Sequence, residues 1–256
     1  MKSLKQMLRS KRVIVGMTTQ HIIAPWLVKL WKRSGADFVY LEYEHGFWNE
    51  ADLAGFVLCC RAEDLPVVSK VPECSRTHVT RLLDCGVTGI QLPWTESREQ
   101  IEQLVSYVKF PPLGIRAVCP GMGNCDYDLH VNGKEFIEQA NNETVVLAHV
   151  ETRKGVESID EILSNPHVDV AFVGMYDLTI SYGHPGEFTH PEVEAAIEKV
   201  MAAARKRDKV VGLWRPDYAT AKPWIEKGVR FFEAPSEVDL IDTGARRLIA
   251  DFQSAS

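Results

Sequence analysis

The sequence predicts an α/β fold, a single (β/α)8 TIM barrel that spans residues 1–256 as one domain. Eight short apolar segments alternate along the chain with segments of helical periodicity. No Pro/Gly/Ser-rich linker and no internal repeat divides the chain, and 256 residues is an ordinary length for one barrel. An open doubly wound sheet is the alternative, but the Gly-x-Gly-x-x-Gly turn of a dinucleotide-binding sheet does not follow the first apolar segment.

Each expected element follows from this alternation. We expect strands at residues 12–17, 38–42, 66–71, 89–92, 145–150, 170–174, 210–213 and 230–233. We expect helices at residues 23–34, 50–61, 77–85, 97–108, 134–141, 154–165, 190–206 and 239–252. A Pro/Gly/Asn-rich segment at 110–128 interrupts the rhythm, and a loop of that length in a compact domain is usually functional.

Composition excludes several classes of function. The net charge of −6 and the lack of any Lys/Arg cluster argue against nucleic-acid binding. No apolar run is long enough to cross a membrane or to form a signal peptide, so we expect a soluble, cytoplasmic protein. The six cysteines contain no Cys-x-x-Cys pair, so we interpret them as reduced thiols.

Two acidic residues follow neighbouring strands. Glu151 comes directly after the apolar segment 145–150, and Asp177 comes shortly after the segment 170–174. In a barrel the carboxyl ends of the strands open on one rim, so both carboxylates face one space. They repel unless a cation lies between them, and oxygen ligands in this number suit Mg²⁺ or Mn²⁺. The alternative is that each acid caps a helix.

Other polar residues near strand ends fall at the same rim. Lys70 alternates inward on its strand, where a charge needs an anionic partner. His149 lies two residues before Glu151 and therefore on the same face. It can donate to a substrate, or it can bind the ion, and ion binding by His149 would favour Mn²⁺, Co²⁺ or Zn²⁺ over Mg²⁺. His45 follows the second strand, where it either reaches the pocket or packs on neighbouring aromatic rings.

Four short motifs together resemble those of the HpcH/HpaI-type class II pyruvate aldolases, a family in the phosphoenolpyruvate/pyruvate-binding barrel superfamily. They are Glu44-His45-Gly46, Pro112-x-Gly114-Ile115-Arg116, Val150-Glu151-Thr152-Arg153 and Gly174-x-x-Asp177-Leu178. The resemblance covers nearly the whole chain in order and spacing. It implies a metal-dependent carbon–carbon lyase that cleaves a 4-hydroxy-2-oxo acid to pyruvate, or a close 2-oxo acid, and an aldehyde.

The resemblance also implies roles for individual residues. Glu151 and Asp177 would hold the metal, and His45 would be the acid/base. Asp84 matches an aspartate that a neighbouring subunit contributes to that histidine. We expect the substrate pocket to be lined by Lys70, His149, Gly174, Tyr176 and Asp177.

A shared site requires an oligomer. Asp84 ends an expected helix just before a strand, so it lies on the opposite rim from its own pocket. By resemblance we expect a homo-oligomer built on a trimer, such as a hexamer. The last helix, with an apolar stripe, is expected to pack on a neighbouring subunit. The stripe comprises Leu240, Ile241, Leu248, Ile249 and Phe252.

Departures from the family pattern indicate altered substrate choice. Lys70 stands where the family usually has arginine, His149 where it has glutamine, and Met175-Tyr176 where it has Pro-Ala. The bulk of this pair predicts a narrow pocket and a small aldehyde, such as glycolaldehyde or a short semialdehyde. Three alternatives remain open: a hydrolase or other 2-oxo-acid enzyme on the same fold, a degenerate binding paralogue, and a Schiff-base mechanism at Lys70.

Overall fold

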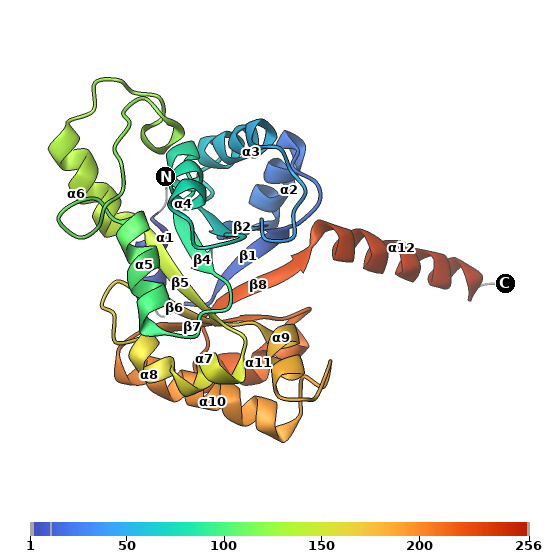
Figure 1. The fold of residues 1–256 in the computed structure, drawn as a ribbon. Coiled ribbons are helices and arrows are strands. Elements are labelled where there is room, and N and C mark those ends of the chain that lie inside the picture. The colour runs from blue at the N-terminus through green and yellow to red at the C-terminus, as the bar shows by residue number, and fades with distance from the viewer. Residues whose placement is uncertain (1–2, 11, 255–256) are drawn as a thin grey trace.

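The computed structural model describes residues 3–10 and 12–254, so both ends of the predicted domain 1–256 lie outside the described residues. Eight parallel strands form a closed barrel in chain order (Figure 1), and the predicted (β/α)8 barrel is confirmed. The strands are β1 (Ile14–Thr19), β2 (Phe38–Glu42), β3 (Val67–Lys70), β4 (Gly89–Leu92), β5 (Val145–Val150), β6 (Val170–Val173), β7 (Val210–Trp214) and β8 (Phe231–Ser236).

The strands are packed between two clusters of buried apolar side chains, one inside the barrel and one between the barrel and its helices. Every residue of β3, β4, β5 and β6 is buried, as parallel strands covered on both faces require. Aromatic rings fill the barrel interior, where Phe38 and Phe231 stack with centroids 4.5 Å apart. Gly16 admits these rings, because a Cβ there would lie 2.2 Å from Phe38. Helix α1 (Leu4–Arg9) packs Leu4, Met7 and Leu8 against the same interior cluster.

Most helices form near the residues predicted for them. These are α2 (Pro25–Ser34), α3 (Glu50–Ala62), α4 (Arg76–Cys85), α5 (Arg98–Val108), α6 (Gly133–Glu143), α10 (Pro191–Lys206) and α12 (Glu237–Gln253). Side-chain caps fix several starts, such as Ser75 on α4 and the Ser97/Gln100 capping box on α5. Gly35 and Gly86 end α2 and α4 in the left-handed conformation.

The structure corrects the prediction at several elements. The single helix expected at 154–165 is two short ones, α7 (Arg153–Glu157) and α8 (Ile159–Ile162), which meet at Ser158 with ψ near 4°. The unpredicted elements are α1, α9 (Met175–Ser181), α11 (Tyr218–Lys227) and the 3-10 turn η1 (Gly123–Cys125). Pro223 lies inside α11, which is why its sequence does not indicate a helix.

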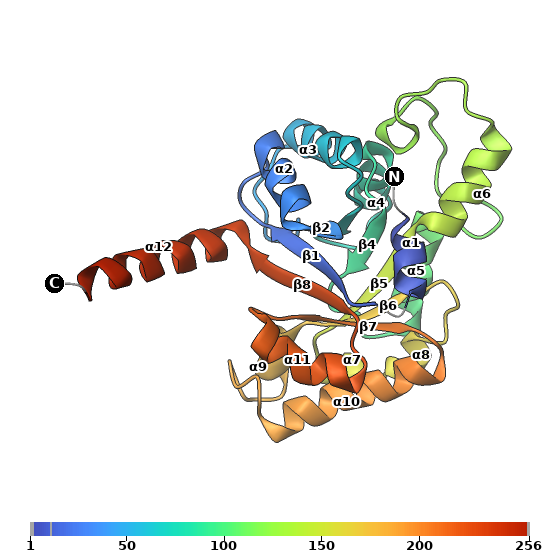
Figure 2. The ribbon, with the colours of Figure 1, turned by 180° about the vertical axis from the view of Figure 1, so that it is seen from behind.

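Two parts of the chain stand away from the barrel. Helix α12 extends outward from the end of β8 in both views (Figures 1 and 2). The segment between α5 and α6 projects from another side, together with α6. Within the described residues, no helix combines the length and the apolar character needed to cross a membrane.

Candidate active site

The carboxyl ends of β5 and β6 bring Glu151 and His149 together and place Asp177 near Glu151. Glu151 follows β5 directly and is only 3% exposed. Its Oε1 accepts a hydrogen bond from the Trp94 amide at 2.7 Å, and its Oε2 lies 3.4 Å from His149 Nε2. Asp177 lies in the first turn of α9, close enough for its charge to act on Glu151.

The charge around Glu151 is predominantly negative. Burial is the main reason that the pKa of Glu151 is raised to about 7. The Trp94 amide and the Lys70 charge oppose this shift, whereas the charges of Asp177 and Glu44 reinforce it. A carboxylate that is buried beside other carboxylates is stabilised by a cation, so this environment fits a metal ion.

Gly174 leaves room for a group beside Glu151. A Cβ at Gly174 would lie 2.3 Å from His149 Nε2 and 2.6 Å from Glu151 Oε2. A larger residue would therefore push into the space that these two donor atoms face. The geometry explains why glycine follows β6 at this position, and it fits an ion bound beside Glu151.

His149 is a neutral imidazole beside this space. Burial, followed by the charge of Lys70, lowers the pKa of His149 well below its ordinary value. Its Nδ1 lies 3.1 Å from Gln91 Nε2, and the ring meets Phe172 edge-on. His149 Nε2 and Gln91 Oε1 are both buried without a hydrogen-bond partner in the described chain. Turning the Gln91 amide over would let Oε1 accept from Nδ1–H, which frees Nε2 to bind an ion.

Lys70 finds its anionic partners within the chain. Its Nζ lies 2.8 Å from Glu42 Oε2 and 2.9 Å from Glu44 Oε2, and the side chain is buried. Burial alone would lower the pKa of Lys70, but the attraction and hydrogen bonds of these two carboxylates raise it above its ordinary value. Lys70 is therefore a protonated ammonium at neutral pH, which is the wrong form for Schiff-base formation.

Glu233 is a part of this acidic site that the sequence did not predict, and Glu44 was quoted only within a motif, without a role in the site. Glu233 is fully buried, its Oε1 has no partner among the described residues, and burial followed by the charge of Glu42 raises its pKa well above the ordinary value. The signal available in the sequence was the period of two on β8, which turns Phe231 and Glu233 to the same inward face.

The remaining predicted residues occupy three different environments. His45 has a side chain 62% exposed, with Nε2 3.8 Å from Glu44 Oε2. Tyr176 is 61% exposed and packs against Phe188 and Trp214, at centroid distances of 4.9 and 6.4 Å. Met175, expected to narrow the pocket with Tyr176, instead joins the buried core because it starts α9 on the inward side.

Asp84 does not join His45 within one chain. It lies near the end of α4, before β4, where its Oδ1 accepts hydrogen bonds from Arg116 Nη2 at 3.0 Å and Asn124 Nδ2 at 3.1 Å. Arg116 is buried and lies over the Phe110 ring. Arg116 therefore serves as a structural partner of Asp84, and the long loop that carries it and Asn124 returns to pack on α4.

Comparison with known proteins identifies the family. The model of the family HpcH/HpaI aldolase/citrate lyase matches residues 23–241. The chain belongs to this family. The resemblance drawn from four motifs is confirmed, and so is the expectation of a lyase of the class II aldolase type.

Individual HpcH/HpaI relatives agree with this assignment. A 5-keto-4-deoxy-D-glucarate aldolase of Klebsiella pneumoniae subsp. pneumoniae is 29% identical over 221 residues, which are 86% of this chain and 85% of the relative. The enzyme of that name from Escherichia coli O6:H1 is 27% identical over 251 residues, 97% and 96% of the two chains. The crystal structure of an HpcH/HpaI aldolase from Desulfitobacterium hafniense DCB-2 matches with a TM-score of 0.94 at 28% identity, covering 99% of this chain and 97% of that one.

Proposed function

We propose that this HpcH/HpaI family member is a metal-dependent lyase that cleaves a 4-hydroxy-2-oxo acid to pyruvate, or a close 2-oxo acid, and an aldehyde. The observation that carries the proposal is the contact of Glu151 with the neutral His149 at the barrel mouth, in a pocket where the charges of Asp177 and Glu44 add to that of Glu151. Relatives named as aldolases, and the class II character of the family, support a divalent ion as cofactor.

Glu151 and Asp177 would hold the ion, with His149 available as a third ligand. Two carboxylates alone favour Mg²⁺ or Mn²⁺, and participation of His149 shifts the preference toward Co²⁺ or Zn²⁺. When bound, the ion would supply positive charge that stabilises the electrons left on the oxo acid as the carbon–carbon bond breaks. Gly174 and Tyr176 would complete the substrate pocket beside it.

His45 would move the proton in the reaction. It would take the proton of the C4 hydroxyl while the C3–C4 bond breaks, which releases a neutral aldehyde and leaves the enolate of pyruvate. Protonation of that enolate at C3 gives pyruvate. The exposure of His45 at the mouth suits a group that exchanges its proton with solvent between turnovers. The ammonium of Lys70, held by Glu42 and Glu44, would face the oxo acid from the barrel interior.

Asp84 would orient His45 of a neighbouring chain in a homo-oligomer. Arg116 and Asn124 both donate to Oδ1, so they fix the Asp84 carboxylate and leave Oδ2 available to a second chain. This arrangement agrees with the position of Asp84 on the opposite rim from its own barrel mouth. It predicts that Asp84→Asn impairs catalysis without changing metal binding in the same chain.

Metal-dependent enolate formation tests the proposed function. The protein is stripped with a chelator, and Mg²⁺, Mn²⁺ or Co²⁺ is returned. We expect exchange of the methyl protons of pyruvate in deuterated water, and pyruvate release from a 4-hydroxy-2-oxo acid with a short chain. Glu151→Gln retains the acceptor for the Trp94 amide but loses the charge, so metal affinity and exchange should fall together at least about 100-fold. Glu157→Gln is the exposed control.

Negative outcomes separate the alternatives. Absence of exchange with all three ions would favour a degenerate binding paralogue over a lyase. Exchange without cleavage of any hydroxy-oxo acid would favour another reaction through the same enolate. Covalent trapping of pyruvate on Lys70 by borohydride would overturn the metal mechanism, and the protonated state of Lys70 predicts that no adduct forms.

A further inference from the structure

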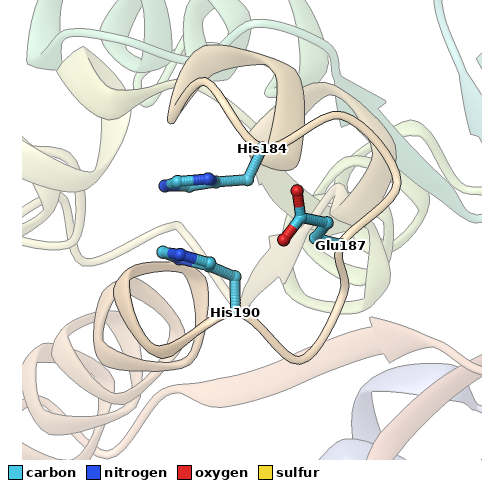
Figure 3. A group of neighbouring side chains, drawn as sticks. All are labelled: His184, Glu187 and His190. Atoms are coloured by element: carbon cyan, nitrogen blue, oxygen red, sulfur yellow. The ribbon is translucent and has the colours of Figure 1, made fainter.

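We infer a second metal site, separate from the barrel mouth, in the loop between α9 and α10. It consists of His184, Glu187 and His190, each three residues from the next. One ligand atom from each side chain lies within 4.8 Å of the other two. The two imidazole rings project side by side, and the Glu187 carboxylate lies next to them (Figure 3).

The loop backbone holds this arrangement without a ligand. The His184 amide donates to Thr179 O at 2.8 Å, and the Glu187 and His190 amides donate at 3.0 Å to His184 O and Glu187 O respectively. The Gly186 amide donates to Thr179 Oγ1 at 3.1 Å. Gly186 has φ of +77°, a conformation that favours glycine and closes the turn around Glu187. The three side chains are therefore presented by a structured loop.

The two imidazole rings stack closely enough for their nitrogens to reach one ion. The centroids of His184 and His190 lie 3.3 Å apart with an interplanar angle of 20°. Two nitrogens bound at 2.0–2.1 Å to one tetrahedral ion lie about 3.3 Å apart. The lone pairs of stacked rings lie in nearly parallel planes, so both rings would rotate about their side-chain bonds, out of the stack, to direct one nitrogen each to a common ion.

One existing hydrogen bond competes with the ion. His190 Nδ1 accepts from the Glu192 amide at 3.3 Å and so caps the start of α10. Binding through Nε2 places the proton on Nδ1 and ends this long bond. Binding through Nδ1 displaces it directly. The substitution His190→Asn would keep a good N-cap for α10 and remove the metal ligand, so it is the appropriate test.

The ligands of this loop site favour a different metal ion from the one expected at the barrel mouth. Two imidazoles and one carboxylate suit Zn²⁺, Co²⁺, Ni²⁺ or Cu²⁺ better than Mg²⁺. Glu192 Oε2, 3.9 Å from His184 Nε2, is close enough to act as a fourth ligand after a small rotation. Glu187 is exposed and both rings are half-buried, so an ion can enter directly from solvent.

The site is coupled to the active-site wall. Phe188 lies between two of the ligands in sequence, and its ring meets Tyr176 edge-on at 4.9 Å. Tyr176 directly precedes Asp177 in α9. An ion on the loop would therefore fix Phe188 and, through it, the position of Tyr176. The existence of the site does not depend on the proposed aldolase function.

Zinc stoichiometry tests this inference. Metal-free protein is dialysed against Zn²⁺, and bound zinc per chain is measured by mass spectrometry for the wild type and for His184→Gln/His190→Asn. We expect the double variant to bind one zinc fewer, and Glu187→Gln to bind the same zinc at least about ten-fold more weakly. In the Co²⁺-loaded wild type we expect visible absorption bands that the double variant lacks. His130→Asn, an exposed histidine on another loop, is the control.

Equal zinc stoichiometry in the wild type and the double variant would overturn the site. Loss of the same zinc in His130→Asn would also overturn it, because the binding would then be unspecific. Glu187→Gln leaves both rings and the helix cap in place, so the test stands if the double variant folds poorly. Failure of the aldolase assays would leave this measurement unaffected, since its readout is bound metal.

Discussion

At the scale of single residues, Gly174 leaves open a space beside Glu151 that one added methyl group would fill. We predict that Gly174→Ala lowers catalytic efficiency at least about 100-fold, because the new Cβ would lie 2.3 Å from His149 Nε2 and 2.6 Å from Glu151 Oε2. Metal affinity should fall with it, as calorimetry with Mn²⁺ would measure. Gly55→Ala is the matched control. Its Cβ meets nothing within 4 Å, and it should stabilise α3 by up to about 1 kcal/mol without changing turnover.

Lys70 is the ammonium group that pairs with the carboxylates of Glu42 and Glu44. We predict that Lys70→Met lowers the free energy of unfolding by about 3–5 kcal/mol, because it leaves Glu42 and Glu44 without their shared partner in a buried site. Urea titration followed by circular dichroism would measure the loss. The double variant Lys70→Met/Glu42→Gln should recover part of it. A Lys70→Met protein as stable as the wild type would contradict this prediction.

At the scale of elements, Lys109 joins the end of α5 to the junction between α6 and β5. Its side chain is fully buried, and Nζ donates to Asn141 O at 2.7 Å and to Thr144 O at 2.9 Å. Burial lowers the pKa of Lys109 from 10.5 to about 8. The unfolded chain therefore holds this proton more tightly than the native state does between pH 8 and 10.5.

Because the unfolded state binds more protons in this window, the contribution of Lys109 to stability rises with pH. We predict that the free energy of unfolding of the wild type rises by up to about 3 kcal/mol relative to that of Lys109→Met between pH 8 and 10.5. Below pH 8 the difference between the two proteins should be constant. Denaturant unfolding of both at several pH values checks this, and a difference that stays flat up to pH 10.5 would contradict it.

At the scale of the whole molecule, α12 exposes its apolar stripe to solvent. It extends away from the barrel, and its apolar side chains are exposed, with Phe252 at 73%, Ile241 at 59% and Leu248 at 57%. An amphipathic helix of this kind is stabilised when its apolar face is covered. We propose that a second copy of the chain covers it in the homo-oligomer that the shared Asp84 requires.

We predict that Leu248→Asp/Phe252→Asp reduces the assembly to a smaller species in light scattering. Activity should fall as well, because chains that separate lose the Asp84 of their neighbour. Arg247→Asp, which alters charge on the same helix outside the apolar stripe, should leave the mass unchanged. A wild-type protein that is monomeric at micromolar concentration would refute both the shared site and the role of α12.

The sequence by itself determined the barrel, the order of its strands and the rim on which Glu151 and Asp177 lie. These follow from local patterns, namely apolar runs, helix caps and the period of two along strands, which act over a few residues. The divided helix at Ser158 and the unpredicted α9 and α11 show the limit of such patterns, because packing on the barrel selected them over weak or contrary propensities.

Only the tertiary structure decided which charges meet. Lys70 was expected to find an anion, but the closed barrel supplies Glu42 and Glu44 from the neighbouring strand and the loop that follows it. Asp84 binds Arg116 because the long loop after α5 returns to α4. The loop after α9 likewise stacks His184 on His190. Contacts of this kind depend on strand register and loop closure across the fold, which no short window of sequence encodes.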